Sequence, residues 1–174
     1  KKVCRYLHER MIQGVELFPI SVNFSRVTLY REAFYETFHA IVDEYAIPHD
    51  CIEIEVTESA FNDIADIVLQ MMNQLDEEGF PIAMDDFGSG YSNMNLLGSL
   101  PLQIIKLDKV FLQEADSNER VKGIIICAVE LAHTMGVQIV CEGAETQQHV
   151  DFLREIGCDF VQGYYFTKPI PQRA

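Results

Sequence analysis

Short apolar runs alternate with longer amphipathic stretches along this chain. The apolar runs have the length of strands and predict them near residues 18–24, 51–56, 80–84, 103–107, 137–141 and 160–163. The longer stretches repeat apolar positions at helical spacing and predict helices over residues 1–13, 29–45, 64–78 and 120–135. Glycine and proline lie where these elements change, as at Gly79, Pro81, Gly136 and Gly157.

Regular alternation of strands and helices predicts a parallel sheet with helical crossovers. We therefore expect an α/β fold of the TIM-like (β/α) barrel type, with about six of the usual eight strands present. The chain opens on a predicted helix with no strand before it. We interpret this as a barrel whose first two strands are missing, and an open α/β sheet is the alternative. No linker or repeat divides residues 1–174, so we expect a single domain.

Composition narrows the classes of function. The formal net charge is −14, from 27 acidic and 13 basic residues, which argues against binding of a nucleic acid polymer. No apolar run reaches the ~20 residues that a membrane-spanning helix needs. The five cysteines are odd in number and contain no CxxC pair, so we expect free thiols in a reducing cytoplasm. The five histidines form no metal-binding motif and are interpreted as surface or packing residues.

Polar side chains follow the predicted strands at or just after their carboxyl ends, where (β/α) barrels gather their chemistry. In chain order they are Asn23, Glu55, Glu58, Asp85, Asp86, Lys106, Asp108, Glu142, Glu145 and Gln162. Each has a structural alternative taken alone: Asn23 could cap a turn, and Glu58 and Glu145 could begin helices. That nearly every strand ends in such groups favours a functional site.

The chemistry of these groups is that of a hard-cation site. Amide and carboxylate oxygens without Cys or His suit Mg²⁺ or Mn²⁺. Several carboxylates around one lysine suit a two-metal site for phosphoester hydrolysis, in which Lys106 would orient the attacking water or neutralise developing charge. The segment 85–92, Asp-Asp-Phe-Gly-Ser-Gly-Tyr-Ser, is the most distinctive part of this pattern.

These segments resemble the EAL domain, the bacterial phosphodiesterase module that opens cyclic di-GMP to linear pGpG. The matching segments occur in family order from about residue 20 onward. They are Val22-Asn23-Phe24-Ser25, Glu55-Val56-Thr57-Glu58-Ser59, residues 85–92, Ile105-Lys106-Leu107-Asp108, Glu142-Gly143-Ala144-Glu145-Thr146 and Gln162-Gly163-Tyr164-Tyr165-Phe166.

The resemblance implies a role for each matched residue. Asn23, Glu55, Asp85 and Asp86 would be metal ligands, and Lys106 and Glu142 would be catalytic. Substrate binding or support of the site is implied for Glu58, Asp108, Glu145 and Gln162. The loop with Phe87, Gly88, Ser89 and Gly90 would shape the metal site, and Ser89 stands where the family commonly has threonine.

The Glu-Ala-Leu motif that names the family does not occur in residues 1–22. We expect it upstream, so the complete protein would be an enzyme and this chain alone would be inactive. A non-catalytic cyclic di-GMP-binding regulatory module is the main alternative, and an enolase-like lyase with Lys106 as base is a third. The resemblance also implies a homodimer of the complete domain, an upstream GGDEF or sensory domain and a cytoplasmic location, including within a membrane-anchored protein.

Overall fold

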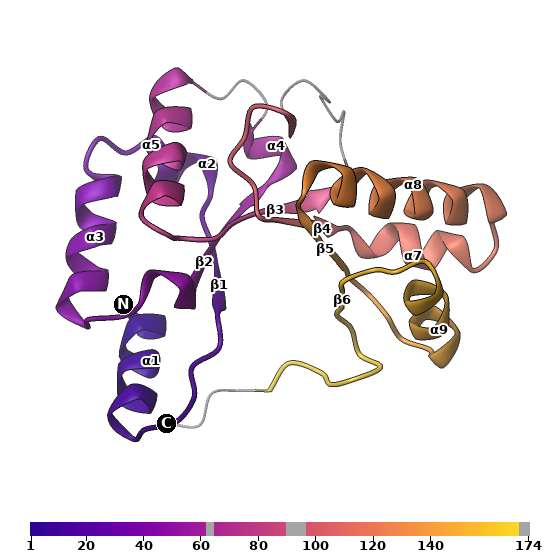
Figure 1. The fold of residues 1–174 in the computed structure, drawn as a ribbon, viewed down its shortest axis with the longest axis horizontal. Coiled ribbons are helices and arrows are strands. Elements are labelled where there is room, and N and C mark those ends of the chain that lie inside the picture. The colour runs from indigo at the N-terminus through magenta and orange to yellow at the C-terminus, as the bar shows by residue number, and fades with distance from the viewer. Residues whose placement is uncertain (62–64, 90–96, 171–174) are drawn as a thin grey trace. The chain divides into compact units, whose positions relative to one another are not determined.

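The computed structural model describes residues 1–61, 65–89 and 97–170. The strands are β1 (Ile20–Asn23), β2 (Ile52–Thr57), β3 (Ile82–Phe87), β4 (Ile104–Leu107), β5 (Gln138–Cys141) and β6 (Phe160–Val161), and neighbours along the sheet are neighbours along the chain. The pairs β1–β2, β4–β5 and β5–β6 are parallel. Figure 1 shows helices between β1 and β2, between β2 and β3, between β4 and β5 and between β5 and β6. The predicted strand–helix alternation is thereby confirmed.

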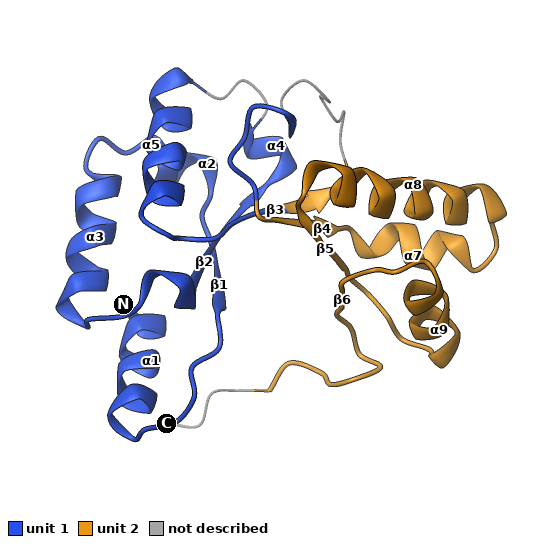
Figure 2. Cartoon of the chain, in the orientation of Figure 1, with its two compact units in different colours: residues 1–84, 93–102 blue, residues 85–92, 103–174 orange. Residues whose placement is uncertain are grey.

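The chain divides into two compact units, which Figure 2 distinguishes by colour. Unit 1 comprises residues 1–84 and 93–102, and unit 2 comprises residues 85–92 and 103–174.

Unit 1 contains β1, β2 and the start of β3, with the helices α1 (Lys2–Ile12), α2 (Arg26–Leu29), α3 (Phe34–Glu44), α4 (Glu58–Phe61) and α5 (Asp66–Glu77). A short 3-10 helix, η1 (His49–Cys51), leads into β2. The residues Ile52, Ile54 and Val56 of β2 are buried, as their alternation along the strand predicts. In the register of the parallel pair, Asn23 lies opposite Glu55.

The predicted helix over 29–45 is wrong in its first part, because α2 ends at Leu29 and α3 begins only at Phe34. Leu29 and Phe34 are both buried. Their spacing of five positions does not fit one helical face, where apolar residues recur at three or four positions. The two buried side chains therefore belong to separate helices, and the described chain turns between them.

A polar cluster joins α3 to the end of α5 in unit 1. The Tyr35 hydroxyl donates a hydrogen bond to Glu78 Oε1, and His39 Nε2 lies 2.6 Å from Glu78 Oε2. The Glu78 carbonyl is 2.8 Å from His49 Nδ1, and the His49 ring stacks on Phe80 at 4.1 Å between centroids. The hydrogen bond to Glu78, with burial and the Glu78 charge, raises the pKa of Tyr35 to about 12.

Unit 2 contains the end of β3, the strands β4, β5 and β6, and the helices α7 (Lys109–Ala115), α8 (Glu119–Met135) and α9 (Gln147–Glu155). Asn118 Oδ1 accepts a hydrogen bond of 3.1 Å from Arg120 N and caps α8. The helix ends at Gly136, whose φ of 72° is left-handed, so the end predicted from the sequence is confirmed. The core of unit 2 includes Ile105, Leu107, Leu112, Ile125, Val129, Ile139 and Leu153.

Candidate functional site

Lys106 of β4 is the centre of the charged groups in unit 2. It is 8% exposed, and its Nζ lies 2.7 Å from Glu142 Oε1 and 3.5 Å from Asp85 Oδ1. A buried ammonium needs such partners, because removing an unpaired charge from water is costly. The structure thus brings together three of the predicted site residues, which arise from β3, from β4 and from the residue after β5.

Asp86, next to Asp85, has an unusual backbone conformation. β3 extends three residues beyond the predicted strand over 80–84, and Asp86, the second of these, has a φ of 55°. This left-handed conformation departs from the extended backbone of a regular strand. Such a conformation costs about 1–3 kcal/mol and persists where the surroundings impose it.

Several charged groups act on the Asp86 carboxyl. Burial is the main cause that raises the pKa of Asp86, and the charges of Asp85, Asp108 and Glu142 raise it further, while Lys106 lowers it. Negative charge therefore exceeds positive charge around this carboxyl. A divalent cation bound here would relieve that repulsion, and carboxylate oxygens are among the ligands that such cations prefer.

Asp108 has a structural role in the described fold. Its Oδ1 accepts a hydrogen bond of 2.8 Å from Val110 N and caps α7. It follows β4 and is not part of the strand that carries Lys106. The negative charge of Asp108 also raises the pKa of Asp86, so Asp108 belongs to the acidic surroundings of the site.

The Glu142–Glu145 loop is held through its backbone. Glu142 N donates to Leu107 O at 3.2 Å, Ala144 N donates to Gln162 O at 3.1 Å, and Tyr165 N donates to Ala144 O at 2.9 Å. Gly143 has a φ of 79°, and a Cβ there would lie 2.4 Å from Lys109 Cβ. Glu145 and Gln162 are both exposed, and the contacts described for them in this loop are made by their backbone atoms.

The predicted ligands of unit 1 form a pair across β1 and β2. Asn23 Nδ2 donates to Glu55 Oε2 at 2.8 Å, and Phe24 N donates to Glu55 O at 2.8 Å. Glu55 is 3% exposed. Because Nδ2 is the donor, the amide oxygen of Asn23 is the atom that could bind a cation. Glu58, in the first turn of α4, is 4% exposed.

The remaining predicted loop residues are only partly described. Phe87 ends β3 and is buried, Gly88 has a φ of 88°, and Ser89 is exposed. A Cβ on Gly88 would lie 2.5 Å from two ring carbons of Phe111. Gly90 lies outside the described residues.

Within the described residues, no group of three or more His, Cys, Asp or Glu side chains is arranged to hold a metal ion. Over the same residues, no helix is both long enough and apolar enough to cross a membrane.

The cysteines are all free thiols, as predicted, and burial raises the pKa of the thiols of Cys141 and Cys158.

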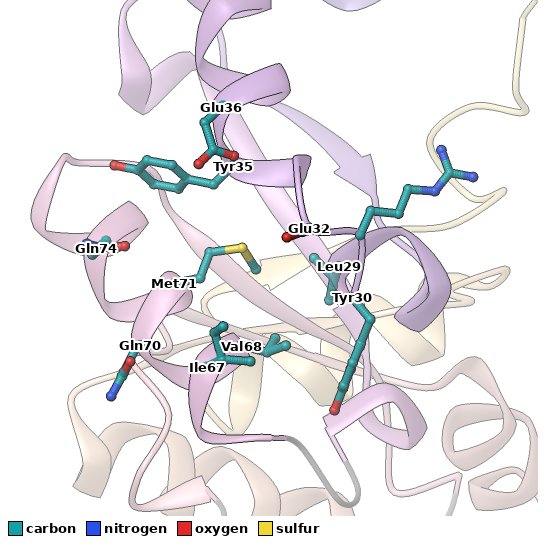
Figure 3. A pocket seen from close by; sticks show the side chains of 11 residues that line it. Leu29, Tyr30, Glu32, Tyr35, Glu36, Ile67, Val68, Gln70, Met71 and Gln74 are labelled. Atoms are coloured by element: carbon teal, nitrogen blue, oxygen red, sulfur yellow. The ribbon is translucent and has the colours of Figure 1, made fainter.

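A separate pocket of unit 1 contains none of the predicted site residues. It has a volume of about 300 Å³ and lies between α5 and the segment around α2 and α3 (Figure 3). Met71, Ile67 and Val68 form an apolar part, and Glu32 and Glu36 add carboxylates. The pocket is therefore not built from the residues of the predicted chemistry.

The EAL domain family model matches residues 1–169. The chain belongs to the EAL domain family. The chain of this EAL protein is 32% identical over 174 residues to the cyclic di-GMP phosphodiesterase NbdA of Pseudomonas aeruginosa, covering 100% of the chain and 22% of that protein. It is 33% identical over 157 residues to the cyclic di-GMP phosphodiesterase RocR of the same organism, covering 89% of the chain and 40% of RocR.

A solved structure of the PaMucR phosphodiesterase in complex with c-di-GMP superposes with a TM-score of 0.91 at 30% identity, over 98% of this chain and 69% of the other. The chain spans less than half of the length of each curated relative, NbdA and RocR. The superposition confirms the predicted fold class, an incomplete TIM-like (β/α) barrel with six strands among the described residues.

Proposed function

We propose that this chain is part of a metal-dependent phosphodiesterase domain that hydrolyses cyclic di-GMP to linear pGpG in bacterial second-messenger signalling. The observation that carries the proposal is the placement of Lys106 Nζ between Glu142, at 2.7 Å, and Asp85, at 3.5 Å. Family membership supports it, because relatives of this chain are cyclic di-GMP phosphodiesterases.

The proposed ligands of the cations, Mg²⁺ or Mn²⁺, are Asn23, Glu55, Asp85 and Asp86. Their oxygens match the preference of these ions, and the excess of negative charge around Asp86 is what a divalent cation would offset. When bound, the cations supply positive charge to the phosphate and lower the pKa of an attacking water. The hydrogen bond from Asn23 fixes the Glu55 carboxylate for this role.

Lys106 and Glu142 are the proposed catalytic residues. The Lys106 ammonium is pre-oriented by two carboxylates, so its N–H groups can hold a water or a phosphate oxygen without reorganising. Glu142 sets the position of that ammonium and is itself held by the bond from its N–H to Leu107 O. Both groups therefore act by positioning charge and by hydrogen bonding.

Supporting roles are proposed for the other predicted residues. Glu58 braces the loop with Phe87, Gly88, Ser89 and Gly90, and Asp108, Glu145 and Gln162 support the site or the substrate. The Glu-Ala-Leu glutamate is proposed to lie upstream of residue 1, so residues 1–174 would be one EAL-type domain without its N-terminal part and inactive alone. A homodimer of the complete domain, an upstream GGDEF or sensory domain and a cytoplasmic location complete the proposal.

The alternative is a non-catalytic cyclic di-GMP-binding module. The test is hydrolysis of cyclic di-GMP with Mg²⁺ or Mn²⁺, with the product identified by chromatography. It compares this chain with a protein that extends upstream to include a Glu-Ala-Leu motif. Linear pGpG from the extended protein supports the enzyme, and binding without turnover supports the binding module.

A matched pair of lysine variants makes this test specific. Lys106→Ala removes the ammonium at the proposed site, whereas Lys122→Ala removes an exposed lysine whose Nζ lies 2.6 Å from Glu119. An exposed pair of that kind contributes little to stability. Turnover lost in the first variant and kept in the second supports the role of Lys106, and equal turnover in both contradicts it.

A further inference from the structure

His149 of α9 is a buried histidine that the proposed mechanism does not use. It is 6% exposed, and both ring nitrogens have partners. Glu145 N lies 3.3 Å from Nδ1, and Asp116 Oδ1 lies 2.8 Å from Nε2. A backbone N–H can only donate, so Nδ1 is the acceptor and carries no proton. Nε2 then carries the proton and donates a hydrogen bond to Asp116 Oδ1.

The hydrogen bond from Glu145 N to His149 Nδ1 lies at the end of the loop that begins with Glu142. Glu142 N is bonded to Leu107 O and Ala144 N to Gln162 O, but the loop continues beyond both anchors to Glu145. The hydrogen bond from Glu145 N to His149 is the anchor at this far end. Glu142 in turn contacts Lys106 at 2.7 Å, so the loop position determines where the proposed catalytic pair lies.

The other ring nitrogen connects the loop to α7. Asp116 is the C-cap residue of α7, and the same helix begins at the capping carboxylate of Asp108. His149 therefore ties the Glu142–Glu145 loop to a helix whose opposite end carries one of the charges around Asp86. A side chain with one acceptor and one donor in a fixed geometry is required to bridge these two groups.

We propose that His149 is a positioning residue that holds the Glu142–Glu145 loop, and through it Glu142, in place for the reaction. The effect on turnover rests on the proposed phosphodiesterase function. The anchoring of the loop does not, because it follows from the contacts of His149 within unit 2.

The main variants are His149→Leu and His149→Gln in the full-length protein. Leucine fills the buried space but can neither accept from Glu145 N nor donate to Asp116. Glutamine has an amide oxygen and an amide N–H group, so it can restore both bonds. Asp116→Ala tests the second bond at a residue whose side chain is 59% exposed, so it remains informative if the leucine variant does not fold.

A control variant separates anchoring from a general loss of stability. Asn118→Ala removes the capping hydrogen bond of α8 at 3.1 Å. It lowers stability by an amount typical of a lost cap, and it leaves the described contacts of His149 intact. Any change seen in His149→Leu but not in Asn118→Ala therefore reports on the loop.

The first readout is hydrogen exchange of the Glu145 amide, followed by mass spectrometry with fragmentation that resolves single residues. We expect at least tenfold faster exchange in His149→Leu, an intermediate effect in Asp116→Ala, and exchange near wild type in His149→Gln and Asn118→Ala. Unchanged exchange at Glu145 in both His149→Leu and Asp116→Ala would overturn the proposal.

The second readout is steady-state hydrolysis of cyclic di-GMP. Because Glu142 acts through Lys106, we expect kcat to fall about tenfold in His149→Leu with KM changed less than twofold, and to recover in His149→Gln. Faster exchange with unchanged kcat would overturn the positioning role. A wild-type protein without turnover would refute the proposed function, and the exchange measurement would still decide whether His149 holds the loop.

Discussion

Replacing Gly163 by alanine tests how tightly the Glu142–Glu145 loop is packed. A Cβ at this position would lie 2.1 Å from Ala144 O and 2.3 Å from Ala144 N, distances that real Cβ atoms do not adopt. Gly163 does not have a positive φ, so its backbone conformation is open to alanine and the steric contact alone carries the effect. The clash is with backbone, which cannot rotate away as a side chain can.

The magnitude follows from what must move. The two hydrogen bonds of Ala144, from its N–H to Gln162 O at 3.1 Å and from Tyr165 N to its oxygen at 2.9 Å, are displaced by the new methyl group. Each backbone bond is worth about 1 kcal/mol net, and overpacking adds about 1–3 kcal/mol. We therefore expect Gly163→Ala to lower the free energy of unfolding by about 3–5 kcal/mol.

The assay is urea unfolding followed by circular dichroism, with Gly123→Ala as the matched control. Gly123 lies within α8 and has no atom within 4 Å of an added Cβ, so alanine there should stabilise the helix. We expect a gain of about 0.5–1 kcal/mol for the control. A loss below about 1 kcal/mol in Gly163→Ala, with an unchanged m-value, would refute the reasoning.

Further predictions concern single side chains. The folded-state pKa of Tyr35, about 12, exceeds the ordinary value of 10.0, so the hydrogen bond to Glu78 stabilises the fold below pH 10 and is lost as Tyr35 ionises. Urea unfolding of the wild-type protein should therefore show a loss of stability between pH 10 and 12, and Tyr35→Phe should remove this loss. The same pH dependence in the variant would contradict this. Asp85→Asn in the complete domain should abolish turnover and weaken Mn²⁺ binding by calorimetry, and wild-type rates would exclude it as a ligand. Lys106→Ala should lower kcat about 10²–10³-fold with Mn²⁺ affinity largely kept, because lysine is no metal ligand; retained kcat would remove it from the mechanism.

The grouping of Lys106 with Asp85 and Glu142 could be predicted from the sequence. The strands are parallel and in chain order, so their carboxyl ends lie at one edge and residues at those ends become neighbours. That rule depends only on the strand pattern, which the apolar runs define clearly. It does not depend on the details of any turn.

The position of Asp86 could not be predicted in the same way. The apolar pattern predicts a strand that ends at Met84, whereas β3 continues to Phe87 and the φ of Asp86 is 55°. Asp is among the non-glycine residues that adopt the left-handed conformation, but the alternation of apolar and polar positions does not indicate which Asp does so.

The sequence does not reveal the role of His149, because a histidine outside any motif predicts a surface or packing residue. Its partners are Glu145, four positions before it, and Asp116 on another helix. The local signal is Thr146, which caps α9 by accepting from His149 N at 3.2 Å and so turns residue 149 back toward the preceding loop. Only the long-range contact with Asp116 shows that the ring is an anchor.

The chain-order arrangement of the strands has a consequence for synthesis. Ile20 pairs with Ile52, and Ile104 with Gln138, so in these pairs each strand finds its partner about 30 residues earlier in the chain. A ribosome adds that many residues in roughly 2–6 s, whereas helices form in about a microsecond. The helices between two paired strands can therefore form before the second strand has been made. Glu142 follows Lys106 by about one such interval, so the lysine meets Glu142, the nearer of its two carboxylate partners, only once β5 has been made.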